Sequence, residues 1–341
     1  MSSTMKETAP TKAPALKQTL RSPFVSLVLD NFVWILIMII LIVAVFTTPI
    51  FFRPSNLINL LVHSVVLALL VLAESICLIS GNFDLSIESI LIFTAVFSAW
   101  LIVPHEAASG LNLSPMAGVL IMLLLGAAIG AFNGFMIAYV KMNAFITTLA
   151  VSIILIGSCV YISRGNTLGP FPDSYTFMGD GRIGGFPVPI MLMIFMYALF
   201  YVVLNFTPFG RKLYAVGGNK NAAQASGINV KRIVLFAYLL SGLISALAGW
   251  VLAGRQGAAV SHMTRDNLLY AFAGAVIGGV SPFGGEGKIL SILGGVILLM
   301  AVNKLLVISH VNPFLITGMA GMIILMAMLV LTLRKLKFME S

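Results

Sequence analysis

The sequence VVLALLVLAESICLISGNFDLS, residues 65–86, decides the fold class of this chain. It completes an apolar run over 57–80 that is long enough to cross a bilayer as a helix, and it then breaks at Gly81 into a polar segment. Lipid cannot hydrogen-bond exposed backbone N–H and C=O groups, so a break at membrane depth must be covered by protein or line a water-filled cavity. The stretch therefore predicts a membrane protein with an interrupted helix.

Apolar runs of similar length recur along the whole chain. Hydrophobic residues make up 60% of the sequence and charged residues only 9%, against roughly 25% charged residues in soluble domains. The pattern predicts an all-α integral membrane fold with about ten transmembrane helices. The predicted spans are 31–50, 57–80, 84–103, 116–140, 143–163, 187–206, 233–254, 268–280, 289–308 and 314–333.

A second break lies in the other half of the chain. Residues 278–288 read GGVSPFGGEGK, and a fresh apolar run follows them, as one also follows the first break near 81–88. Paired glycine interruptions in the two halves of a membrane protein point to a transport pathway.

The net charge of +9 sets the expected topology. Most Lys and Arg residues lie in segments that are cytoplasmic if both termini are inside, as the positive-inside rule requires. The basic excess therefore reflects topology and does not indicate a nucleic-acid partner. We expect a disordered cytoplasmic tail over 1–28, one transmembrane domain over 29–335 and a short cytoplasmic tail over 336–341.

Polar side chains inside the predicted spans and breaks are candidates for a substrate pathway, because intramembrane polar groups are costly. The candidates are Glu74, Asn82, Asp84, Ser86, Asn133, Asn303 and Lys304. Other interpretations stay open for several of them. Asp84 and Ser86 also suit capping of the helix after the break, and Glu74 and Lys304 suit a buried ion pair. Asn133 suits a hydrogen bond between helices.

Small residues recur every fourth position at Gly126, Gly130 and Gly134, and again at Gly274 and Gly278. Such stripes allow two membrane helices to approach closely. We interpret both as packing surfaces.

The loop 207–232 is the longest predicted cytoplasmic segment between spans. Asn219 suits the N-cap of a short helix, the alanines after it favour helix, and Gly227 suits a left-handed terminator. A rigid helix outside the membrane fits docking into a groove of a partner. A merely solvated loop is the alternative.

No motif for catalysis or for a metal is recognised. The GxGxxG pattern at 179–184 lacks a preceding strand and a following helix, and Gly287 and Lys288 are not followed by Ser or Thr as a phosphate loop requires. The histidines show no metal-ligand spacing. A membrane-embedded enzyme is therefore disfavoured, and we predict a transport subunit with no catalytic residues, metal or cofactor of its own.

Four blocks resemble the ribose/galactose-type permeases of carbohydrate ABC importers. They lie at 80–89, 133–149, 208–254 and 278–295. The resemblance implies a pair of permease subunits, identical or different, in the inner membrane. It also implies a cytoplasmic ABC ATPase that binds the ATP and a soluble sugar-binding protein outside.

By that resemblance, the loop 207–232 holds the segment that couples the permease to the ATPase. Its candidate residues are Gly217, Gly218, Asn219, Ala222, Ala223, Ser226 and Gly227. The implied function is import of a monosaccharide such as a pentose or hexose. A nucleoside importer on a related scaffold and an ion-coupled secondary transporter are the alternatives.

Overall fold

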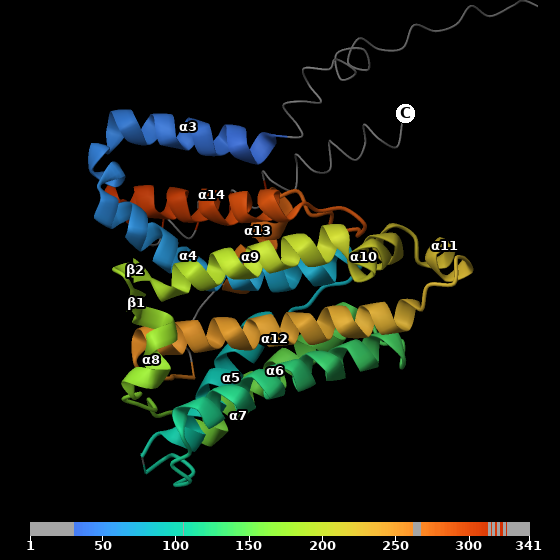
Figure 1. Ribbon diagram of the computed structural model, residues 1–341, viewed down its shortest axis with the longest axis horizontal. Coiled ribbons are helices and arrows are strands. Elements are labelled where there is room, and N and C mark those ends of the chain that lie inside the picture. The colour runs from blue at the N-terminus through green and yellow to red at the C-terminus, as the bar shows by residue number, and fades with distance from the viewer. Residues whose placement is uncertain are drawn as a thin grey trace, which may run out of the picture.

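The computed structural model describes residues 31–104, 106–261 and 267–312, together with isolated helical positions at 315, 318, 321, 322 and 325. Every regular element in these ranges is a helix, apart from one two-stranded hairpin (Figure 1). The all-α prediction is confirmed. The predicted tails and most of the predicted span 314–333 lie outside the described residues.

Among the described residues, six helices are long and apolar enough to cross a membrane. Each coincides within a few residues with a predicted span, because an uninterrupted apolar run satisfies its own backbone only as a helix. They are α4 (Pro54–Ile79), α6 (Pro115–Ala138), α7 (Ala144–Ser163), α9 (Val188–Phe206), α12 (Val230–Gln256) and α14 (Ile289–Ile308).

Three further apolar helices are shorter. These are α3 (Phe32–Thr47), α5 (Ile87–Ile102) and α13 (Asn267–Ile277). The 16 residues of α5 and the 11 residues of α13 extend about 24 Å and 16 Å, below the roughly 30 Å of a bilayer core. The expectation of about ten full spans is therefore not confirmed, since α5 and α13 each begin or end at one of the glycine breaks.

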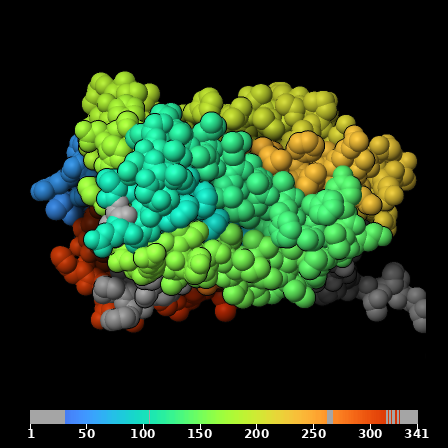
Figure 2. Space-filling model, turned by 90° about the horizontal axis from the view of Figure 1, so that it is seen from below, coloured from blue at the N-terminus to red at the C-terminus, as the bar shows by residue number. Residues whose placement is uncertain are grey.

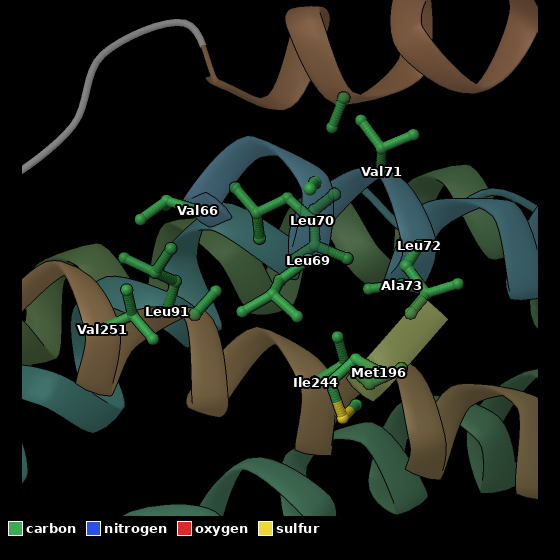
Figure 3. Packing of buried hydrophobic residues seen from close by; sticks show 14 of the residues in the cluster. Val66, Leu69, Leu70, Val71, Leu72, Ala73, Leu91, Met196, Ile244 and Val251 are labelled. Carbon is green, nitrogen blue, oxygen red and sulfur yellow. The ribbon is translucent and has the colours of Figure 1, made fainter. Parts of the chain in front are cut away.

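Helix α4 forms the centre of the bundle. All of residues 64–79 are buried, which is the burial expected of a helix that is apolar on every side. Figure 3 shows its side chains packed against those of α5, α9 and α12. The labelled residues are Val66, Leu69, Leu70, Val71, Leu72 and Ala73 of α4, with Leu91, Met196, Ile244 and Val251 around them.

Helices α6 and α7 instead present an apolar surface outward, on the face that Figure 2 shows. Leu120 and Leu124 of α6 and Ile153 and Ile154 of α7 are each more than half exposed. A surface this apolar is suited to lipid rather than water. The two kinds of burial distinguish the core helix α4 from the peripheral helices.

Glycines bring α6 and α12 into close contact. A Cβ atom on Gly130 would overlap the carbonyl oxygen of Tyr238, and one on Gly126 would lie 2.5 Å from the Cβ of Ala246. On α12, a Cβ on Gly242 would overlap Gly126. The predicted packing role of this glycine stripe is confirmed.

The elements outside the long helices gather at the two ends of the bundle (Figure 1). One end holds α8 (Asp173–Asp180) and the hairpin of β1 (Arg182–Ile183) and β2 (Phe186–Pro187). The other holds α10 (Pro208–Gly218) and α11 (Lys220–Ala225). The sequence predicted α11, whereas it missed α8, the hairpin and α10.

Candidate functional site

The first break turns the chain back into the protein after α4. Gly81 has φ +76°, a backbone conformation that favours glycine because it has no Cβ. Beyond it Asp84 is fully buried, and its backbone N–H faces the carboxyl group of Glu74 in α4. The segment 80–86 thus folds back beside the end of α4, and α5 begins inside the bundle. The prediction of a broken helix here is confirmed.

Asp84 ties this segment to α12 and, through Ser86, to α6. Its Oδ1 accepts hydrogen bonds from the backbone N–H of Ser86 at 3.0 Å and from the Ser86 hydroxyl at 2.5 Å. Its Oδ2 accepts one from the hydroxyl of Ser241 in α12 at 2.8 Å. Asn133 of α6 donates to the Ser86 oxygen at 2.8 Å. The break is therefore held by buried hydrogen bonds, three of them to a carboxyl group.

The predicted capping role of Ser86 is wrong. Ser86 occupies the N-cap position of α5, but its side chain makes no capping hydrogen bond and donates to Asp84 instead. A capping serine must accept a backbone N–H with its oxygen, whereas the Ser86 oxygen accepts the side-chain amide of Asn133 at 2.8 Å. Asn133 makes the predicted hydrogen bond between helices.

The alternative in which Glu74 forms an ion pair with Lys304 is also wrong. Within the described part of the chain no salt bridge joins them, and Glu74 is 1% exposed with no hydrogen-bond partner for its Oε2. Lys304 instead acts electrostatically on His63, which lies about 16 Å from Glu74 along α4. The two charges sit at different depths, which no sequence spacing reveals.

The second break meets the first at four glycines, Gly81, Gly217, Gly284 and Gly285, which we call the glycine junction. The N–H of Gly285 donates to the carbonyl oxygen of Ile79 at 2.9 Å. A Cβ on Gly284 would lie 2.7 Å from the Gly217 oxygen and 2.8 Å from the Gly81 Cα, and one on Gly217 would overlap the Ile79 oxygen. Only glycines allow the three segments to approach this closely.

Two side chains extend the glycine junction. The Tyr214 hydroxyl of α10 donates to the carbonyl oxygen of Gly287 at 2.7 Å, and the Lys220 ammonium of α11 donates to Asn82 Oδ1 at 3.4 Å. Partial desolvation lowers the pKa of Lys220 from its usual value. The pair α10 and α11 is therefore bonded to both breaks. Sequence reasoning missed Tyr214, Lys220 and also Ser241, although a polar residue inside an apolar span was a usable signal for Ser241.

Helix α11 is built as the sequence predicted. The Asn219 side chain accepts a hydrogen bond from the Ala222 N–H at 3.0 Å, and Gly227 has φ +80°. Gly218, Asn219, Ala222, Ser226 and Gly227 are exposed, whereas Ala223 is 4% exposed and Gly217 lies in the glycine junction. One face of this segment contacts the breaks and the other is open.

Asn303 lies apart from the breaks, toward the opposite end of the bundle. It lines a cavity of about 340 Å³ between α4, α12, α13 and α14. The polar residues that line it are His63, Arg255, Gln256, Asn267, Tyr270 and Asn303. The predicted pathway residues thus fall into two groups, one at the first break and one at this end of α14.

Buried polar groups inside apolar helices, two helix breaks and a helical segment bonded to both breaks together define a multi-pass membrane transport protein. Residues 56–333 match the family described as branched-chain amino acid transport system / permease component. The chain belongs to this family of transport permeases, so its role is translocation and not catalysis.

Curated relatives cover most of the chain. The ribose import permease protein RbsC of Bacillus subtilis is 34% identical over 293 residues, 85% of this chain and 89% of that protein. The L-arabinose transport system permease protein AraH of Escherichia coli is 35% identical over 253 residues, 74% of this chain and 75% of that protein. The galactose/methyl galactoside import permease protein MglC of Escherichia coli is 31% identical over 319 residues, 90% of this chain and 95% of that protein. No solved structure matches the chain.

Proposed function

We propose that this chain is the membrane-spanning subunit of an ATP-driven importer that carries a monosaccharide across the inner membrane. The three relatives are named for ribose, L-arabinose and galactose, which supports a sugar as the substrate. Neither import of a nucleoside nor coupling to an ion gradient gains support from them. A transport assay with the three sugars identifies which of them is carried.

The glycine junction is the observation that carries the proposal. Helices α10 and α11 lie outside the long helices, yet they bond to both breaks through Tyr214 and Lys220. A partner that displaces this segment would therefore move both breaks at once. We propose that the ATPase docks on 207–232, against the exposed side of Gly218, Asn219, Ala222, Ser226 and Gly227, while Gly217 and Ala223 transmit the movement inward.

The segment that would move is polar and buried. Glu74 Oε2 and Asn133 Oδ1 have no hydrogen-bond partner, although each is enclosed. Buried polar atoms without partners are costly and call for an explanation such as water or ligand in another state. We propose that Glu74, Asn82, Asp84, Ser86 and Asn133 line the route when the first break opens. Asn303 and Lys304 would then line its other half.

The wider arrangement follows from the same proposal. The transmembrane domain comprises 29–335 with about ten spans, 314–333 being the last, and the tails 1–28 and 336–341 are cytoplasmic. Two permease subunits, identical or different, pair in the lipid bilayer. A separate ATPase binds the ATP, and a soluble sugar-binding protein delivers substrate to the end that holds α8 and the hairpin.

Reconstitution tests the proposal. The chain is inserted into vesicles with its ATPase and sugar-binding protein, and uptake of labelled ribose, L-arabinose and galactose is measured with and without ATP. We expect that, when the binding protein is present, at least one sugar is taken up with ATP and none is taken up without it. Uptake without ATP that collapses with an uncoupler would show a secondary transporter and would overturn the proposal.

A further inference from the structure

A cavity occupies the half of the bundle that lies away from the glycine junction. Its volume is about 340 Å³, at the lower end of small-molecule sites, which span about 300 to 1,000 Å³. Its lining combines the polar residues named above with Asn303 and five apolar residues from the same helices. The apolar residues are Val66, Leu67, Leu252, Leu299 and Met300.

The chemistry of the lining suits a neutral compound with several hydroxyl groups. The side chains of Asn267 and Asn303 offer both donors and acceptors, and Arg255 offers donors only. Arg255 Nη1 donates to the Val62 carbonyl oxygen at 3.4 Å, which holds the guanidinium group at the cavity. None of the described residues that line the cavity is Asp or Glu.

The start of α13 at the cavity is already bonded to an acidic side chain. The two carboxyl oxygens of Glu88 accept the backbone N–H groups of Asn267 and Leu268 at 3.1 Å and 3.2 Å. An acidic side chain thus already neutralises the positive end of the helix dipole. The amide groups of the lining are matched to hydroxyl groups, and its apolar side chains to the C–H face of a ring.

Glu88 also connects the cavity to the first break. It lies in the first turn of α5, two residues after Ser86, and it holds the start of α13. A shift of the segment 80–86 therefore moves a wall of the cavity. This connection gives a route by which the glycine junction changes the cavity.

We infer that this cavity binds one neutral monosaccharide-sized polyol during transport. The inference rests on the proposed function and adds to it the location of a sugar-binding site. The sugar occupies a site within one subunit, between α4, α12, α13 and α14, before the break opens.

Protection of an introduced thiol tests the inference. Both native cysteines that the sequence contains, Cys77 and Cys159, are buried, so the background of labelling is low. The full chain with Asn303→Cys is treated in membranes with a small polar thiol reagent. Ribose, L-arabinose or galactose is present, and betaine at the same concentration replaces the sugar in the reference sample. Val307→Cys is the control, because Val307 is 52% exposed on the same helix and does not line the cavity.

We expect the transported sugar to slow labelling of Asn303→Cys several-fold and to leave Val307→Cys unchanged. A second comparison removes an amide: Asn303→Leu weakens binding of the same sugar about three- to tenfold, whereas Asn205→Leu, an exposed amide on α9, does not. Met300→Trp places a larger side chain in the cavity, and loss of sugar binding by this variant supports the same conclusion.

Several results would overturn the inference. They are failure of Asn303→Cys to label, equal protection at both thiols, protection by a sugar acid but not by a neutral sugar, and normal ATP-driven uptake by Met300→Trp. In the last case the proposed function still stands, because the complex imports sugar by another route. If the unsubstituted complex imports no sugar with ATP, the proposed function fails whatever the thiol shows.

Discussion

Substitution of Gly217 by alanine tests the glycine junction most directly. A Cβ at this position would overlap the carbonyl oxygen of Ile79 and would lie 2.5 Å from the backbone N of Gly285. Both obstacles are backbone atoms, which cannot rotate away as a side chain can. Overpacking of this kind costs about 1–3 kcal/mol, which corresponds to a change of about five- to 150-fold in the population of the closed junction.

The matched control is the next residue. A Cβ on Gly218 meets nothing within 4 Å, so Gly218→Ala should be tolerated. Both variants are purified, their melting temperatures are compared, and ATP-driven sugar uptake is measured in vesicles that contain the ATPase and the sugar-binding protein. We expect Gly217→Ala to lower the melting temperature and to lose most of its uptake per ATP hydrolysed, while Gly218→Ala keeps its melting temperature.

Equal uptake and equal melting temperatures for the two variants would refute the reasoning. Such a result would mean that the close approach of Gly217 to Ile79 and Gly285 is not kept in the working transporter. If Gly217→Ala fails to fold, Tyr214→Phe, which removes only the hydrogen bond to the carbonyl oxygen of Gly287, tests the role of the junction in uptake.

Three other substitutions probe separate parts of the same structure. Asp84→Leu removes the acceptor of three hydrogen bonds and should lower the melting temperature far more than Ser241→Ala, which loses one charge-assisted bond of about 1.5–3 kcal/mol; equal effects would contradict the network. Gly130→Val should abolish folded protein in a detergent size-exclusion assay, while Gly157→Val, with open space around its Cβ, should not. Lys220→Met should reduce uptake several-fold at an unchanged melting temperature, because its 3.4 Å bond to the first break lies outside the core; unchanged uptake would remove Lys220 from the coupling contact.

The two helix breaks are features that local sequence is sufficient to predict. Glycines and polar residues at 81–86 and 278–285 predicted interrupted helices, and α4 and α13 end at Ile79 and Ile277 as a consequence. The N-cap of α11 at Asn219 was equally predictable from the sequence, because a cap involves residues only three positions apart. By contrast, α10 was missed, since its glycines and short apolar face gave no clear helical period.

The candidate site could be predicted only in part. Asp84, Ser86 and Asn133 were recognised as functional candidates, and the structure brings the three together. The fourth member of this group, Ser241, lies 157 positions from Asp84 and was not recognised. The hypothesis that paired Glu74 with Lys304 failed because opposite charge gives no information on depth in the membrane.

The sequence by itself determined that the chain is helical and membrane-spanning and where its helices are interrupted, because hydropathy, glycine conformation and helix caps act within a few residues. Only the tertiary structure decided that α4 is enclosed while α7 faces outward, that Gly217 meets both breaks, and that Asn303 lines a cavity with Arg255. These contacts join residues far apart in the chain. They depend on how closely backbones approach, which the packing of the whole bundle sets.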